Sequence, residues 1–217
     1  MNNGKKKKAL TATNILIVLS VFIYVLDKYI FVFGDQMFET PGPIEKILGF
    51  CGGRVFMTLC FFDTSIVDGE IWRLFSFLFV HLFILHLVVN MVSLYIVGNV
   101  VEKRWGHFFL IAVFWGLGIL NILVTNSLPF LNVTDTATGG ASGAVFGLMG
   151  IVAAYNFFDR KNRFIFTKAQ KFFLIVYGVV FTYFMGIWTI ACHNLGLLMG
   201  FTLGIGLILL EKKRSCR

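Results

Sequence analysis

Long apolar stretches without charged residues dominate the chain. Five segments contain no Asp, Glu, Lys or Arg: 9–26, 74–101, 105–134, 136–158 and 172–210. A helix needs roughly 20 apolar residues to cross a bilayer core about 30 Å thick, and each segment is long enough for at least one crossing. The pattern therefore predicts membrane-spanning helices rather than a water-soluble fold.

Segment 172–210 is too long for a single crossing. As one helix it would measure about 58 Å at 1.5 Å per residue, nearly twice the thickness of the bilayer core. We expect a turn within 186–189 that divides it into two helices. In 105–134 the helical signal fades after Thr125 into Asn126-Ser127-Leu128-Pro129, which is typical of a turn. The sequence predicts an all-α bundle of six spans, near 9–26, 77–100, 105–125, 141–158, 172–187 and 192–210.

Composition and charge agree with a membrane protein and give its orientation. Apolar residues make up 58% of the 217 positions and charged residues 14%, whereas soluble domains carry about 45–50% and 25%. Of the 19 Lys and Arg residues, 15 fall on one side of the predicted bundle, in segments 5–8, 103–104, 160–171 and 212–217. By the positive-inside rule both termini are cytoplasmic. The net charge of +8 is then a topology signal with some attraction to anionic lipid, and we expect no nucleic-acid partner.

The predicted domain organisation is one membrane domain over 9–210, with basic cytoplasmic tails at 1–8 and 211–217. Its first loop, 27–73, holds seven of the eleven acidic residues and a short apolar run. Loops of this length are usually functional, and we expect a partly embedded extracytoplasmic lobe. Cys51 and Cys60 lie in this loop, and their spacing leaves open whether they pair.

Five polar residues of the predicted spans fall at one depth in the membrane. Polar side chains inside spans are costly, so each is a functional hypothesis. Spans two, four and six run in the same direction, which places five residues in one layer roughly 5–15 Å below the outer surface: His81, His86, Asn90, Ser142 and His193. A serine beside a neutral histidine is the minimal pair for acyl transfer, because the imidazole can accept the hydroxyl proton and return it to the leaving amine.

The surroundings of Ser142 favour a developing oxyanion. Ser142 lies in Gly139-Gly140-Ala141-Ser142-Gly143 at a predicted helix N-terminus, where unpaired N–H groups and the positive dipole end favour negative charge. His86 and Asn90 are four residues apart, share a helix face and can add side-chain donors. This chemistry needs no metal and no cofactor.

Glycines allow the two helices to approach. Gly143 and Gly147 lie on one face of span four, and Gly196 and Gly200 repeat at the same interval on span six. Faces with small residues every four positions let helices pack backbone to backbone. Packing of these faces would bring Ser142 against His193.

Taken together, these motifs resemble those of the rhomboid intramembrane serine proteases over about residues 71–206. The matching residues are Trp72-Arg73, His81-x4-His86-x3-Asn90, Gly98-x3-Glu102, Gly140-Ala141-Ser142-Gly143 and His193-x2-Gly196-x3-Gly200. The resemblance implies that Ser142 is the nucleophile, that His193 is the general base and acid, and that the Ser142 backbone forms an oxyanion hole with His86 and Asn90. Phe146, where some family members carry tyrosine, is expected to stack on His193.

The resemblance also implies a substrate class and a location. Substrates would be single-pass membrane proteins, cut in the transmembrane segment near the outer leaflet beside a small residue. A mobile fifth helix would admit them, and the short tails suit a bacterial plasma membrane. The alternative is a non-catalytic rhomboid-like protein that binds unstable transmembrane helices, although such relatives usually lack the serine or the histidine. A haem carrier with His86 and His193 as axial ligands would leave the serine motif without a role. The substrate's identity and the oligomeric state stay open.

Overall fold

The computed structural model describes residues 10–30, 54–62, 64–128, 131, 137–184 and 186–215. These residues form a helical bundle. The described part of the chain holds no β-strand, only an isolated antiparallel bridge between Phe61 and Thr138. The all-α membrane fold predicted from the apolar segments is confirmed.

Six helical segments correspond to the six predicted spans. The first is α1 (Ala12–Val25), extended by a π turn, η1 (Leu26–Ile30); the others are α5 (Ile84–Trp105), α6 (His107–Asn126), α7 (Ser142–Phe158), the fifth segment and α10 (Ile187–Ser215). The fifth segment is not a regular helix, since α8 (Lys168–Val176) passes through a π turn, η5 (Tyr177–Phe181), into α9 (Thr182–Phe184). Short elements α3 (Arg54–Leu59), α4 (Arg73–Ser76), η2 (Phe77–Phe79) and η4 (Arg160–Asn162) complete the described residues.

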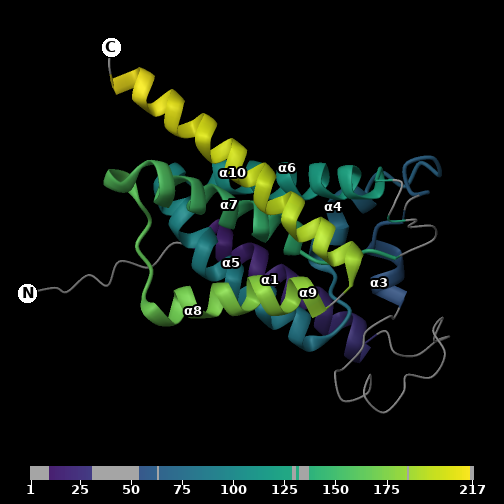
Figure 1. Cartoon of the computed structure of the whole chain (residues 1–217). Helices are drawn as coiled ribbons and strands as arrows, with labels where there is room; N and C mark the ends of the chain where they lie inside the picture. The colour runs from purple at the N-terminus through teal and green to yellow at the C-terminus, as the bar shows by residue number, and fades with distance from the viewer. Residues whose placement is uncertain are drawn as a thin grey trace, which may run out of the picture.

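Four helices among the described residues are long and apolar enough to cross a membrane: α1 with its extension, α5, α6 and α10. Helix α7 is also apolar but has 17 residues. It is the most enclosed helix of the bundle, packing against α5, α6 and α10. Figure 1 shows α10 crossing the bundle diagonally and projecting beyond it at its C-terminal end.

The boundaries of the second and sixth spans differ most from the sequence prediction. The second span was expected from residue 77, but α5 begins at Ile84, because α4 and η2 occupy 73–79 and the chain is extended at Phe83. His81 therefore precedes α5 instead of lying within it. The sixth span was expected over 192–210, but α10 begins at Ile187, directly after Gly186 with φ +95°, and continues to Ser215. Hydropathy predicts where a helix leaves the bilayer, whereas the helix itself ends where its backbone hydrogen bonds end, which can lie outside the bilayer.

Close backbone contact joins α7 to α10. A Cβ atom added to Gly200 would lie 1.8 Å from the carbonyl oxygen of Gly147, and one added to Gly196 would lie 2.6 Å from that of Gly143. Because residue numbers rise together along this contact, the two helices run parallel. The positions at which Gly143 and Gly147 would carry a side chain face α6. A Cβ added to Gly143 would meet the Asn121 side chain, and one added to Gly147 would meet the Leu117 side chain.

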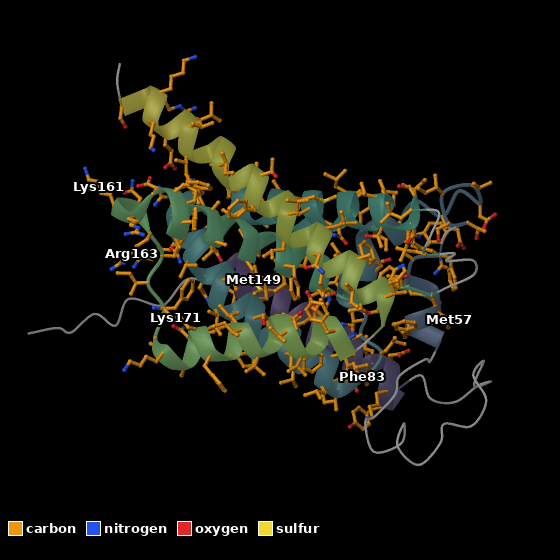
Figure 2. All side chains as sticks on the ribbon, in the orientation of Figure 1. Met57, Phe83, Met149, Lys161, Arg163 and Lys171 are labelled. Atoms are coloured by element: carbon orange, nitrogen blue, oxygen red, sulfur yellow. The ribbon has the colours of Figure 1, made fainter. Side chains whose placement is uncertain are left out.

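Basic residues gather at one end of the bundle, which we call the basic end. In Figure 2, Lys161, Arg163 and Lys171 lie at this end, and Met57 and Phe83 lie at the opposite end. The fold is tied together at the basic end by two buried or half-buried acids. Glu211 of α10 pairs with Arg104 of α5 at 2.7 Å, and Glu102 of α5 binds the beginning of α1.

The Glu102 carboxylate joins α5 to the beginning of α1. It accepts hydrogen bonds from the backbone N–H groups of Ala12 at 2.7 Å and Thr13 at 2.9 Å, and also contacts the Thr13 hydroxyl and His107. The first N–H groups of a helix have no partner within the helix, so this carboxylate satisfies two of them and meets the positive end of the α1 dipole.

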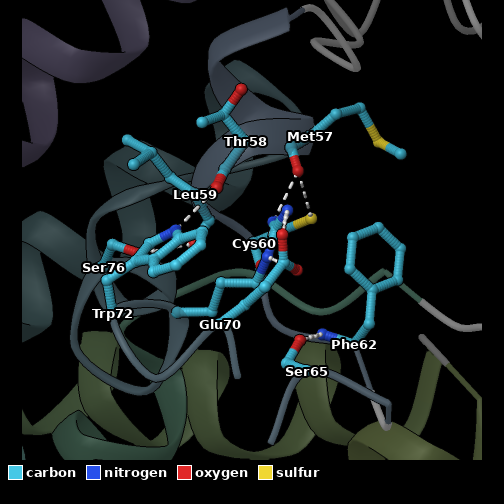
Figure 3. Close-up of polar contacts among 10 residues, drawn as sticks. Met57, Thr58, Leu59, Cys60, Phe62, Ser65, Glu70, Trp72 and Ser76 are labelled. Atoms are coloured by element: carbon cyan, nitrogen blue, oxygen red, sulfur yellow. Dashed lines mark hydrogen bonds and ion pairs between the residues drawn. The ribbon is translucent and has the colours of Figure 1, made fainter. Parts of the chain in front are cut away.

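Arg73 organises the first loop at the opposite end, and Figure 3 labels three residues that it contacts, Met57, Cys60 and Glu70. Its guanidinium donates to the carbonyl oxygens of Met57 at 2.6 Å and Cys60 at 2.8 Å, and it pairs with Glu70. Cys60 is a buried free thiol, and burial raises its pKa to about 11. Cys51, the other cysteine of this loop, lies outside the described residues.

Candidate active site

The chain leading into α7 is held by backbone hydrogen bonds. Thr138 and Phe61 each donate to the other's carbonyl at 2.8 Å, and the Gly140 N–H donates to the carbonyl of Phe77 at 2.9 Å. Gly140 has φ +133°, a conformation that favours glycine. A Cβ at this position would lie 2.7 Å from Cε1 of His86. The His86 imidazole therefore lies against the turn that leads into α7.

Ser142 is the first residue of α7 and is half-buried. It lines a small cavity of about 20 Å³ together with residues of α6, α10 and the preceding glycines, among them Asn121, Trp188 and Cys192. A space of this size holds about one water molecule. Because the first N–H groups of a helix lack partners within the helix, the N-terminus of α7 offers donors to a negatively charged oxygen beside this cavity.

His193 lies in the second turn of α10 and is 4% exposed. Its ring stacks on Phe146, with centroids 4.1 Å apart and planes inclined by 16°. Phe146 follows Ser142 by four residues, so the two share a face of α7. The hydroxyl of Thr182 in α9 lies 3.0 Å from Nδ1 of His193.

Ser142 and His193, both of which the structure describes, lie near the contact between α7 and α10, but they are not hydrogen-bonded to each other. Gly143 and Gly196 touch through their backbones, and each is close in sequence to one of these residues. Among the described residues no hydrogen bond links the Ser142 hydroxyl to the imidazole. Catalytic hydrogen bonds are often long in unliganded enzymes and shorten when substrate binds.

Asn90 is fully buried and bridges two helical segments. Its Nδ2 donates to the carbonyl oxygen of His86 at 3.0 Å, and its Oδ1 accepts from the Tyr177 hydroxyl at 2.9 Å. A side-chain amide has two N–H donors. One donor of Asn90 is therefore left for a further partner after these two bonds.

Two residues of this region, Asn121 and Thr182, were not anticipated from the sequence. Asn121 of α6 is 1% exposed, donates from Nδ2 to the carbonyl oxygen of Cys192 at 2.8 Å, and accepts from the Cys192 thiol at 2.9 Å. Asn121 thus binds the backbone carbonyl of Cys192, the residue directly before His193. Both residues are polar side chains within apolar spans, a signal that marks functional candidates and was available in spans three and five.

Comparison with known proteins places the chain in a family. The rhomboid domain model matches residues 68–210, which is more than half of the chain. The chain belongs to the rhomboid family. Its rhomboid domain contains α5 to α9, α10 as far as residue 210 and all the residues of the candidate site, whereas α1 precedes the match. The resemblance seen in the sequence is confirmed, and the apolar helices and the family together make this rhomboid an integral membrane protein.

Several curated rhomboids are similar to the chain. It is 32% identical over 160 residues to Rhomboid-like protease 2 of Toxoplasma gondii, covering 69% of this chain and 54% of that protein. Identity to Putative rhomboid protease YdcA of Bacillus subtilis is 26% over 162 residues, covering 72% and 77%. Identity to Rhomboid protease GlpG of Salmonella choleraesuis is 24% over 214 residues, covering 97% and 68%. This rhomboid therefore spans about half the length of the Toxoplasma relative and larger shares of the two bacterial ones.

Proposed function

We propose that this rhomboid is an intramembrane serine endopeptidase, with Ser142 as nucleophile and His193 as general base and acid. The observation that carries the proposal is the stack of His193 on Phe146, one helical turn from Ser142. The stack supports a fixed imidazole at the contact between α7 and α10. Several similar proteins carry protease names, which agrees with this activity.

The proposed reaction proceeds by acyl transfer. His193 Nε2 accepts the hydroxyl proton as Ser142 Oγ attacks the peptide carbonyl, and the same proton goes to the leaving amine when the C–N bond breaks. Water then hydrolyses the acyl-enzyme with His193 again acting as base. The oxyanion would be bound by the backbone N–H of Ser142, by the remaining donor of Asn90 and by the His86 ring that lies against Gly140.

The proposed substrate is the transmembrane segment of a single-pass membrane protein, cut beside a small residue near the outer leaflet. Ser142 is the first residue of α7, and His193 lies about 9 Å from the start of α10, both away from the basic end. If the basic end is cytoplasmic, as the positive-inside rule predicts, the reaction occurs in the outer half of the bilayer. We propose a bacterial plasma membrane as its location, with both termini in the cytoplasm.

The test is cleavage of a reporter membrane protein in proteoliposomes, together with labelling by a serine-directed fluorophosphonate. We expect Ser142→Ala and His193→Ala to abolish cleavage, and Ser142→Ala to abolish labelling. Ser127→Ala is the matched control, because Ser127 is exposed at the end of α6 and lies outside the proposed chemistry. Undiminished cleavage by Ser142→Ala would refute the assignment. Reporter binding without cleavage by the wild-type chain would favour the non-catalytic alternative.

A further inference from the structure

The fifth helical segment contacts the candidate site through two hydroxyl groups. Helix α8 has no buried residue, whereas Tyr177 and Thr182, in η5 and α9, are each 2% exposed. The Tyr177 hydroxyl donates to Asn90, and the Thr182 hydroxyl lies 3.0 Å from His193 Nδ1. Both buried hydroxyls are thus bonded to residues that the proposed reaction uses.

The bond to Nδ1 bears on which ring nitrogen of His193 can act as a base. A neutral imidazole has one N–H donor and one acceptor nitrogen, and the partner of one nitrogen sets the state of the other. Ser142 can be deprotonated by Nε2 only when the ring proton is on Nδ1. In that state Nδ1–H donates to the Thr182 oxygen, and 3.0 Å is an ordinary length for such a bond.

In the part of the chain that the structure describes, the other groups around the imidazole form no hydrogen bond with Nδ1. Phe146 of α7 covers one face of the ring, and the Tyr177 ring of η5 lies 6.3 Å away with its hydroxyl committed to Asn90. His86 of α5 is near enough for an electrostatic interaction, and the neighbouring Cys192 thiol of α10 donates to Asn121. Among the described residues, no carboxylate forms a hydrogen bond or ion pair with His193.

We propose that Thr182 is a positioning residue for His193. Its hydroxyl oxygen accepts the hydrogen bond from Nδ1–H, holds the ring against Phe146 and keeps the Nε2 lone pair available for Ser142. The imidazolium that forms during the reaction keeps the same Nδ1–H bond. A neutral hydroxyl thereby takes the orienting part that a buried aspartate has in a Ser-His-Asp triad. The inference rests on the proposed serine protease function.

Two substitutions of Thr182 separate its hydroxyl from its bulk. Thr182→Val keeps the shape and loses the hydroxyl, whereas Thr182→Ser keeps the hydroxyl. Thr202→Val is the control, because Thr202 is an exposed residue of α10 bonded only to its own helix. The measurements are kcat and KM for the reporter substrate and the rate of fluorophosphonate labelling of Ser142, for which no transmembrane substrate has to enter.

We expect Thr182→Val to lower kcat and the labelling rate together by about 10- to 100-fold, less than the roughly 10⁴-fold loss on neutralising the aspartate of a triad. KM should change little, and Thr182→Ser should recover most of the activity. The ¹⁵N NMR signals of His193, assigned by comparison with His193→Gln, should report a proton on Nδ1 in the wild type and a tautomer mixture in Thr182→Val.

Three results would overturn this role for Thr182. They are a Thr182→Val variant with wild-type or raised kcat, a Thr182→Ser variant as impaired as Thr182→Val, and unchanged His193 ¹⁵N signals in Thr182→Val. If the wild-type chain cleaves the reporter and is labelled at Ser142, any of these outcomes would overturn the role of Thr182 alone. A wild-type chain that neither cleaves nor is labelled would instead remove the proposed function, and the role of Thr182 with it.

Discussion

The Tyr177 hydroxyl donates a hydrogen bond of 2.9 Å to the side-chain oxygen of Asn90 and so joins the fifth helical segment to α5. Both side chains are buried. A substitution at Asn90 removes this interhelical bond together with a proposed oxyanion donor. Removal of the Tyr177 hydroxyl removes the bond alone. Comparing the two substitutions therefore separates the structural effect of the bond from the proposed catalytic effect of the Asn90 amide.

Asn90→Ala should lower kcat by roughly 10²-fold with little change in KM, as for the loss of an oxyanion-hole donor. Tyr177→Phe should lower kcat by less than about 10-fold, because the Asn90 amide is retained. Each variant should lower the free energy of unfolding by about 1–3 kcal/mol, since each leaves a buried polar group without its partner. Reporter kinetics and denaturation in one detergent measure both quantities. Equal losses of kcat would assign Asn90 to packing.

Asn121→Ala should be strongly destabilising. The variant leaves the Cys192 carbonyl and thiol without partners and opens a cavity between α6 and the contact of Gly143 with Gly196. We expect a loss of about 2–5 kcal/mol in the free energy of unfolding. Cys192→Ala is the comparison, and it should cost less because the carbonyl keeps its bond to Nδ2. If the two variants unfold at the same denaturant concentration, the bond from Asn121 Nδ2 to the Cys192 carbonyl adds no stability beyond that of the thiol bond.

Gly200→Ala should disrupt the contact between α7 and α10. Its new Cβ would fall 1.8 Å from the Gly147 carbonyl oxygen, and both groups are backbone-fixed, so the helices must separate. We expect a loss of at least about 3 kcal/mol, within the range of severe core substitutions. Gly206→Ala on the same helix is the control, because nothing lies within 4 Å of its added Cβ. Thermal unfolding of both proteins measures the difference, and similar midpoints would contradict the tight contact.

Glu102→Ala should destabilise the beginning of α1. The substitution removes the acceptor of the Ala12 and Thr13 N–H groups, and charge-assisted bonds of this kind contribute about 1.5–3 kcal/mol each when buried. Glu211→Ala removes a more exposed ion pair and should cost less than about 1 kcal/mol. Unfolding curves and hydrogen exchange at Ala12 and Thr13 test the contrast. Unaltered exchange in Glu102→Ala would argue against this capping.

Much of the fold could be predicted because a bilayer imposes a length on every apolar segment. The uncharged stretches located all six helical segments. Of the turn predicted within 186–189, Gly186 precedes α10, but residues 187–189 already belong to that helix. The ends of the helices were less accurate. Lys212, Lys213 and Arg214 are unfavourable in lipid but fully compatible with a helix, so α10 continues through them.

The candidate site was accessible to sequence reasoning where residues begin a span. Counting from the N-terminal ends of α5, α7 and α10 finds His86, Ser142 and His193, whose catalytic roles remain predictions. The same layer lies five residues before the end of α6, at Asn121, and near the end of the fifth helical segment, at Thr182, the first residue of α9. Hydropathy gives the depth of these two residues but not the rotation of each helix about its axis, and their partners depend on that rotation.

The π turn Tyr177–Phe181 determines which side chains of the fifth segment meet the site. In a regular α-helix, residues five apart point about 140° away from each other, so Tyr177 and Thr182 would face different directions. The wider turn lets both hydroxyls reach the candidate site, where Tyr177 bonds to Asn90 and Thr182 to His193. Loss of one residue from this turn would leave enough length to reach across the lipid, yet it would present another side chain to the imidazole. Insertion or deletion of a single residue at this position would therefore change the surroundings of His193 without altering any residue of the proposed reaction.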